Sequence, residues 1–184
     1  ALSQSPLLPP EPSPSRNAAL VREWADRLLA NDPKVRATAE AALVTGADRS
    51  LPLLRRFLDP RHEDLHVVTF EILQRIGPPA MPLLVELLRH EWVSIRRSAV
   101  SELIDLTPHT AGIQTALRRA LRDEDPIVAG DAARALGALG KRASPSVGAL
   151  VNTLSHEDPY VRVYAAEALA SIGPSAASAT RVLA

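Results

Sequence analysis

The chain repeats one apolar pattern five times, at intervals that suit a pair of α-helices. Branched apolar residues stand 30, 30, 33 and 33 residues apart, at Val35, Leu65, Ile95, Val128 and Val161. A mostly small residue follows four positions later, at Ala39, Thr69, Ala99, Ala132 and Ala165. A leucine follows eight positions later, at Leu43, Leu73, Leu103, Leu136 and Leu169. Offsets of four and eight share one helical face, so each unit is predicted to contain an amphipathic helix.

The ends of this first helix are marked in several units. An N-cap acceptor precedes a proline at Asp32-Pro33, Asp125-Pro126 and Asp158-Pro159. Proline is tolerated at the first helical position because its missing N–H would have no partner there. Stop signals stand at Gly77-Pro78, Gly140 and Gly173-Pro174, where glycine is expected to form a left-handed C-cap. These signals predict a first helix of about 13 residues.

A second helix is predicted in each unit after a short turn. Its apolar anchors are Leu54, Leu84, Leu117, Leu150 and Leu183, followed one turn later by Leu58, Leu88, Leu121 and Leu154. Two helices joined by a short turn form an antiparallel hairpin, which must stack on its neighbours to bury both apolar faces. We therefore predict an all-α, right-handed α-α superhelix of about five helical hairpins. The two 30-residue units should have shorter turns than the 33-residue units, with no loss of helical core.

The domain organisation follows from the limits of this pattern. Residues 1–16 hold five of the 16 prolines and are expected to form an extended linker. Residues 17–184 are expected to form one repeat domain, in which a helix at 17–30 caps the stack. Trp24 of this helix is expected to pack into the core of the domain. The predicted repeats are 31–60, 61–90, 91–123, 124–156 and an incomplete 157–184. Because the chain ends inside a second helix, we expect further repeats or a neighbouring domain to follow.

Composition excludes several classes of function. The 21 basic and 21 acidic residues give no net charge, and aromatic residues are only 3%, so a nucleic-acid partner is not expected. No cysteine is present, which excludes thiol nucleophiles and Cys-ligated zinc, and no apolar run reaches the length of a membrane span. The compartment stays undetermined. Two lysines beside abundant arginine and alanine suggest a bacterial genome of high GC content.

Two units carry the pattern in its fullest form. They read Asp125-Pro126-Ile127-Val128 with Ala132 and Ala135-Leu136-Gly137, and Asp158-Pro159-Tyr160-Val161-Arg162 with Ala165, Ala168-Leu169 and Ile172-Gly173. This pattern resembles the short HEAT-like repeats of the phycobilisome-lyase type, and the resemblance covers about residues 31 to 184. It implies a helical solenoid that binds other proteins, and it keeps open a second hypothesis, a bilin lyase that handles a chromophore.

Histidine motifs offer two metal-site hypotheses. Residues 62–66 match the HExxH zinc motif, but the repeat alignment places His62 in the turn before the helix and His66 within it. His-Glu pairs also occur at 62–63, 90–91 and 156–157, whereas the related deoxyhypusine hydroxylases carry such pairs inside the first helix. The aligned pairs here are Ala37-Thr38, Val67-Val68, Arg97-Ser98, Gly130-Asp131 and Val163-Tyr164. We therefore interpret the histidines as turn and surface residues and expect no metal or other cofactor.

Polar residues of the second helices are the candidate binding site, because these helices usually line the concave face of a HEAT-like array. The candidates are Arg55, Arg56, Glu86, Arg89, Arg118, Arg119, Arg122 and Asn152. Aligned positions on successive second helices alternate in charge, which favours a solvated face that carries both positive and negative residues. A local patch for an acidic partner in the helix at 111–122 is the alternative. Arg36, Arg96 and Arg162 follow the branched anchor and are interpreted as structural.

The sequence contains no coherent catalytic constellation. The functional hypothesis is therefore a non-catalytic scaffold whose concave face binds another protein or another domain of its own polypeptide. The lyase hypothesis is the alternative.

Overall fold

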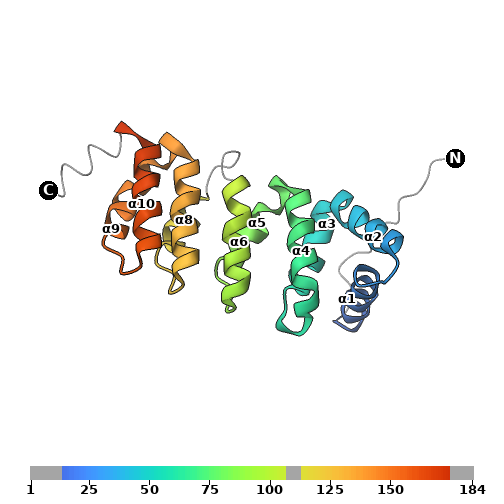
Figure 1. The fold of residues 1–184 in the computed structure, drawn as a ribbon. Coiled ribbons are helices and arrows are strands. Elements are labelled where there is room, and N and C mark those ends of the chain that lie inside the picture. The colour runs from blue at the N-terminus through green and yellow to red at the C-terminus, as the bar shows by residue number, and fades with distance from the viewer. Residues whose placement is uncertain (1–13, 107–112, 175–184) are drawn as a thin grey trace. The chain divides into compact units, whose positions relative to one another are not determined.

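The computed structural model describes residues 14–106 and 113–174, and within these ranges every regular element is a helix. The chain divides into two compact units, one up to Ala80 and one from Met81 onward. Figure 1 shows the helices of each unit arranged as successive hairpins. None of the helices in the described ranges is long and apolar enough to cross a lipid bilayer. The predicted all-α solenoid is confirmed.

The first unit contains the opening helix, the first predicted repeat and the first helix of the second repeat. Its elements are α1 (Pro14–Leu28), α2 (Pro33–Thr45), α3 (Ala47–Phe57), η1 (Pro60–His62), α4 (Glu63–Ile76) and η2 (Pro78–Ala80). The α2 helix contacts α1, α3 and α4. The opening helix begins at Pro14, three residues before the predicted start, because proline suits the first helical position. The part of the predicted linker at 1–13 lies outside the described residues.

The second unit contains the second helix of the predicted repeat at 61–90 and the repeats that follow it. Its elements are α5 (Met81–Leu87), α6 (Val93–Leu106), α7 (Gln114–Ala120), α8 (Pro126–Ala138), η4 (Gly140–Ser146), α9 (Val147–Thr153) and α10 (Pro159–Ile172). The α8 helix packs against both α6 and α10, the first helices of its neighbouring repeats (Figure 1). The predicted anchor Leu183 and the end of the fifth repeat lie outside the described residues.

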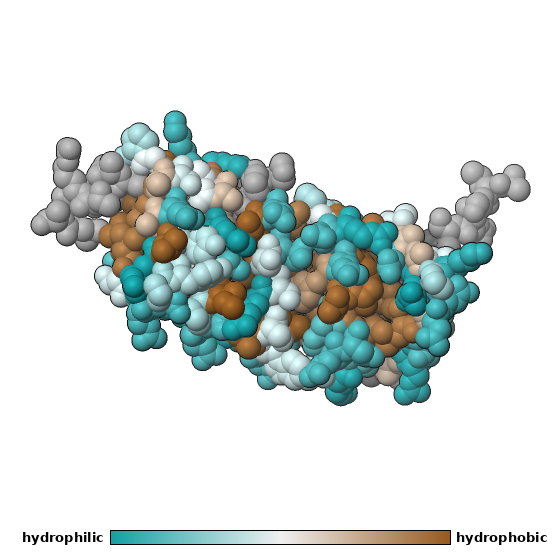
Figure 2. Space-filling view, viewed as in Figure 1, coloured by the Kyte–Doolittle hydropathy of each residue, from teal (hydrophilic) through white to brown (hydrophobic). Residues whose placement is uncertain are grey.

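The predicted apolar stripe is confirmed with one exception. All five small residues and all five leucines of the first helices are buried, as are the anchors Leu65, Ile95, Val128 and Val161. Val35 is the exception, because 41% of its surface remains exposed. Leu29 and Val67 are exposed nearby, and Figure 2 shows apolar surface over the α1, α2 and α4 part of the first unit. Trp24 is only half-buried, and the Arg27 guanidinium lies 5.3 Å from its ring centroid.

The N-caps form as predicted, whereas the glycine stops differ in detail. Carboxylate oxygens of Asp32, Asp125 and Asp158 each accept a backbone N–H at the start of the following helix. Gly77 has φ 73° and ψ −137°, and Gly173 has φ 79° and ψ −146°. The positive φ is as expected, but these ψ values lie far from the left-handed helical region, so the left-handed caps predicted at these two glycines are wrong. Glycine is needed at both because other residues rarely adopt this backbone.

Repeat length is set inside the hairpins. The turns between successive repeats, at 58–62, 88–92, 121–125 and 154–158, all contain five residues. The connections within the hairpins cover 46, 77–80, 107–113 and 139–146, so the two longer repeats carry longer connections, as predicted. The second helices α5, α7 and α9 have only seven residues each, shorter than expected. In α5 and α9, prolines near the start limit how far the helix can extend toward the N-terminus, because Pro82 and Pro145 cannot donate to a helical hydrogen-bond ladder.

Small residues allow α8 and α10 to approach closely. A Cβ on Gly137 would lie 3.0 Å from the Ala168 Cα, and a Cβ on Gly130 would lie 2.3 Å from the Tyr160 ring. The Tyr160 hydroxyl donates to the buried Asp131 carboxylate at 2.9 Å. Burial, together with this carboxylate, raises the pKa of Tyr160 to about 12. The glycine at 130 therefore provides the slot in which the tyrosine ring reaches Asp131.

Candidate functional site

An open groove of about 1010 Å³ lies between α5 and α7 in the second unit. We call it the arginine groove. It is lined by Pro82, Val85, Glu86, Leu88, Arg89, His90, Arg96, Thr115, Ala116, Arg119, Ala120, Arg122, Asp123 and Glu124. Leu88 and Ala120 are buried beneath it. Apart from Arg96 on α6, its charged residues come from the second helices and the turns that follow them. The groove therefore combines an apolar floor with a charged rim.

Four of the predicted site residues meet in the arginine groove. They are Glu86, Arg89, Arg119 and Arg122, and all four are exposed. Within the described residues, the Arg89, Arg119 and Arg122 side chains make no hydrogen bond or ion pair, whereas Glu86 does interact with the protein. Arginine presents a planar fork of donors that suits a carboxylate. Three such forks are thus available to a partner at one place.

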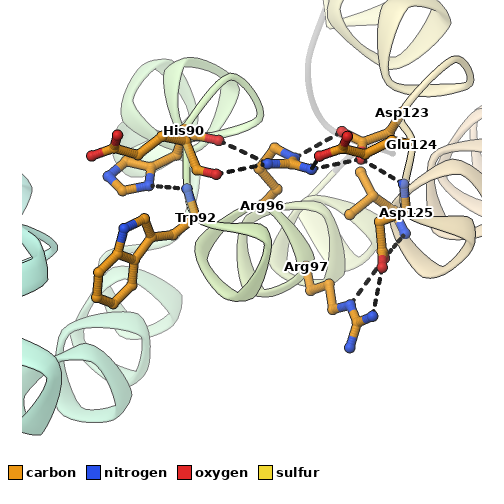
Figure 3. Close-up of polar contacts among 9 residues, drawn as sticks. His90, Trp92, Arg96, Arg97, Asp123, Glu124 and Asp125 are labelled. Atoms are coloured by element: carbon orange, nitrogen blue, oxygen red, sulfur yellow. Dashed lines mark hydrogen bonds and ion pairs between the residues drawn. The ribbon is translucent and has the colours of Figure 1, made fainter.

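One wall of the groove is a network around Arg96, a residue only 7% exposed. Its Nε and Nη2 donate to the two Asp123 carboxylate oxygens at 2.8 and 2.9 Å, and Nη2 also reaches Glu124 at 3.1 Å. Its Nη1 donates to the carbonyls of His90 and Glu91, both at 3.1 Å (Figure 3). The hydrogen bond with Asp123 raises the pKa of Arg96. Arg96 thereby joins the turns before and after its repeat.

A second ion pair lies beside this network, and its arginine, Arg97, directly follows Arg96 in α6. Arg97 donates from Nε and Nη2 to the two Asp125 carboxylate oxygens, at 2.9 and 2.5 Å (Figure 3). Asp125 also accepts the Val128 N–H as the N-cap of α8. The hydrogen bond with Arg97 holds the pKa of the Asp125 carboxyl below its usual range. The cap of α8 is therefore fixed from the preceding repeat.

A smaller groove of about 250 Å³ follows between α7 and α9. The predicted residues Arg118, Arg122 and Asn152 line it, so Arg122 borders both grooves. Arg118 donates to the Pro145 carbonyl at 3.1 Å and to the Thr115 hydroxyl at 3.2 Å. Arg118 therefore connects consecutive hairpins, while Arg122 and Asn152 remain exposed.

The remaining predicted residues, Arg55 and Arg56, lie on α3 in the first unit. Both are exposed in the last turn of that helix, and Arg55 has an interaction within the protein. Basic side chains at a helix C-terminus are stabilised by the helix dipole. The predicted set thus comprises residues of the two grooves and a separate pair on α3.

The histidines act in turns and at a helix surface. His90 Nδ1 accepts the Trp92 N–H at 3.1 Å, and His156 Nδ1 accepts the Asp158 N–H at 3.0 Å. His62 is the N-cap residue of α4 and His66 lies within that helix, as the alignment predicted. No group of three potential metal-ligating side chains occurs in residues 14–106 and 113–174.

The arginines predicted to be structural share one contact. Nη1 of Arg36, Arg96 and Arg162 each donates to the carbonyl six residues earlier, at Ala30, His90 and His156. Only Arg96 adds carboxylates from the following turn in the contacts described. Asp123 was not predicted as a site residue. The repeat alignment could have revealed it, because Asp123 takes the same turn position as His90 and His156 and likewise accepts the N–H two residues later, from Asp125.

Comparison with known proteins agrees with this architecture. The family model for HEAT repeats matches residues 113–184, and no curated protein sequence gives a significant match. An engineered protein of solved structure is similar, with 22% identity, a TM-score of 0.55, and coverage of 83% of this chain and 78% of that one. A designed armadillo repeat protein in complex with the peptide (KR)4 has 17% identity, a TM-score of 0.56, and coverage of 86% and 84%.

A natural structure is also similar. The CpcE–CpcF complex of phycocyanin lyase from a Nostoc species has 18% identity and a TM-score of 0.57, with coverage of 94% of this chain and 70% of that one. Identities this low establish the fold alone. The chain is an all-helical solenoid of the HEAT and armadillo type. Residues 113–184 are the part of this fold that the family model for HEAT repeats matches.

Proposed function

We propose that the chain is a non-catalytic scaffold that binds another protein, or another domain of its own polypeptide, through the second helices of residues 81–174. The observation that supports this proposal is the arginine groove and the smaller groove, which follow one another along α5, α7 and α9. Their shared residue, Arg122, would let one bound segment contact consecutive repeats.

The energetics of such a surface suit a repeat protein. Each hairpin adds a modest contact area, and the stacked frame holds these areas in fixed positions, so little ordering is required on binding. Internal ion pairs occupy Arg96 and Arg97, whereas the Arg89, Arg119 and Arg122 side chains have no partner among the described residues. The surface therefore has both a stable support and free binding groups.

Reconstitution with a purified partner would test the scaffold function. Crosslinking in the source organism would identify candidates, and the direct interaction would then be measured by calorimetry with purified components. We expect a stoichiometric complex that Arg119→Glu with Arg122→Glu abolishes. Arg22→Glu with Arg49→Glu, which changes the same charge on the first unit, should leave it intact. Equal binding by both double variants would contradict the proposed surface.

The bilin lyase is a second candidate function. It is supported by the likeness of fold to the phycocyanin lyase complex, which extends over 94% of this chain. Incubation with a bilin and an acceptor biliprotein would test it, with absorbance measured after denaturing electrophoresis. A covalently coloured acceptor would favour the lyase over the scaffold.

A further inference from the structure

The proposed function leaves the chemistry of the partner open, and the arginine groove points to it. We infer that the bound element is an extended acidic protein segment whose carboxylates pair with Arg89, Arg119 and Arg122. This inference rests on the proposed function. Small apolar side chains between the carboxylates would lie on the floor at Val85 and Ala116.

The balance of charge in the groove carries this inference. The lining includes four arginines and three carboxylates. Arg96 engages both oxygens of Asp123 and also reaches Glu124, so this buried arginine balances one of the two negative charges of the wall. The other three arginines are exposed and have no side-chain partner within the described residues. These three exposed arginines outnumber the two exposed glutamates of the lining, Glu86 and Glu124, so the charge open to a partner is net positive.

This local charge contrasts with the chain as a whole. The 21 basic residues equal the 21 acidic residues, so the groove is not a sample of a generally basic surface. Arg89 and Arg122 occupy equivalent positions in consecutive repeats, each directly after the buried leucine that follows the second helix. Equivalent positions in a stack repeat the same geometry, which suits a segment that runs along the repeats.

A protein segment fits the groove better than a nucleic acid does. Continuous phosphate chains are bound through many cationic contacts, and single strands also stack their bases on aromatic rings. The groove has three available arginines, no Phe, Tyr or Trp among its lining residues, and Glu86 and Glu124 on its rim. Glu124 is 86% exposed and would repel a continuous polyanion. Carboxylates spaced along a peptide can avoid these two glutamates.

Direct binding would test this chemistry. Fluorescein-labelled 12-residue peptides of alternating Glu-Ala, Gln-Ala and Lys-Ala, together with oligo-dT, would be titrated with the full chain in an anisotropy assay. We expect the Glu-Ala peptide to bind at least tenfold more tightly than the others, and its affinity to fall when salt rises from 50 to 500 mM. Arg119→Gln with Arg122→Gln should weaken this binding at least tenfold, because two charge-assisted pairs are lost.

Arg22→Gln with Arg49→Gln, again in the first unit, is the matched control and should bind the Glu-Ala peptide as the natural chain does. A random peptide display selection on the same protein separates the two proposals. Selected peptides that are neutral or basic, or that bind the Arg119 and Arg122 variant equally well, would overturn the acidic segment and leave the scaffold standing. Tighter binding of oligo-dT would also overturn it. A selection that yields no binder would contradict both.

Discussion

The α2 helix of the first unit and the α8 helix of the second have the same length and the same Asp-Pro start, yet they differ in burial. Only Ala39 and Leu43 are buried in α2, whereas most of α8 is buried. The α8 sequence is rich in alanine and glycine, which lets α10 approach it closely at Gly137. In α2, Lys34, Glu40 and other long side chains occupy surface positions. The comparison shows that one repeat pattern supports both a deeply buried helix and a largely exposed one.

The polar contacts at the start of α8 and in the repeat before it are also more numerous than the equivalent contacts at α2. Asp32 accepts a backbone N–H at the start of α2, whereas Asp125 accepts such a bond at the start of α8 and also two bonds from Arg97. The arginine that follows the branched anchor likewise contacts one carbonyl at Arg36, but two carbonyls and two carboxylates at Arg96. Interactions between neighbouring repeats therefore add to local capping in the second unit.

Replacing the anchoring arginines should give the largest difference between the two regions. Arg96→Ala is expected to lower the free energy of unfolding by about 3 kcal/mol, because it leaves the Asp123 carboxylate without its partner in a site little exposed to water. Arg36→Ala should cost about 1 kcal/mol, since it removes one hydrogen bond. Native-state hydrogen exchange would report both losses locally. Equal losses would show that the carboxylate network contributes little.

The branched anchors should give the next largest difference. Val128 is fully buried and Val35 is 41% exposed. Val128→Ala should therefore destabilise its repeat by about 2 kcal/mol through lost burial and a cavity, and Val35→Ala by less than about 0.5 kcal/mol. Urea denaturation of the two variants would measure this. A similar cost at both sites would mean that Val35 is covered in solution.

The N-caps offer a smaller contrast. Asp125→Ala should cost about 1.5 kcal/mol, because both the cap and the Arg97 pair are lost. Asp32→Ala should cost about 1 kcal/mol, the usual value for a cap alone. Exchange rates of the amides in the first turns of α2 and α8 would separate the two effects. Arg97→Ala serves as a control, because it removes the pair and keeps the cap.

At one equivalent position the two helices should prefer different residues, alanine in α2 and glycine in α8. Ala37→Gly in α2 should destabilise by about 1 kcal/mol through helix propensity, because Ala37 is exposed. Gly130→Ala in α8 should also destabilise, by about 1 kcal/mol, because the new Cβ displaces the Tyr160 ring from Asp131. In a Tyr160→Ala background, Gly130→Ala should become stabilising. The free energies of unfolding of the natural chain, the two single variants and the double variant form a complete double-mutant cycle. If Gly130→Ala remains destabilising in the Tyr160→Ala background, Gly130 does not act by making room for the Tyr160 ring.

The pH dependence of the Asp125 pair should be the smallest effect. Because its folded pKa is lowered, the ionised carboxylate stabilises the fold above the ordinary aspartate pKa of about 4, and this stabilisation is lost as the pH falls through the lowered value. Asp125→Asn should therefore cost under about 1 kcal/mol at pH 7 and progressively less below pH 4. Urea midpoints measured against pH would reveal a constant difference if Asp125 does not titrate in this way.

The repeat pattern predicted the helices and caps because these depend on residues a few positions apart. The backbone of Gly77 and the short α5 helix were not predicted correctly, because both depend on how the chain turns after the first helix. The exposure of Val35 was also missed, since the column alone does not show which neighbours a repeat will have.

The candidate site was only partly predictable from the sequence. Repeat alignment placed Arg89, Arg119 and Arg122 on second helices. The structure has Arg119 on α7 and the other two in the turns that follow α5 and α7, and it brings all three to one groove. It did not reveal that Arg118 is engaged with the Pro145 carbonyl, or that Arg96 pairs with Asp123 and Glu124. These contacts join residues 27 or 28 positions apart, and their pairing depends on the packing of neighbouring hairpins.

The constant five-residue turns and the variable connections inside the hairpins have a consequence for engineering. The invariant turns carry the caps and the arginine contacts, so a change of length there would shift one hairpin against the next. The connections at 77–80 and 139–146 already differ in length without altering the stripe of buried residues. They are therefore the natural positions for an inserted epitope, fluorophore attachment site or protease cleavage sequence that leaves the array intact.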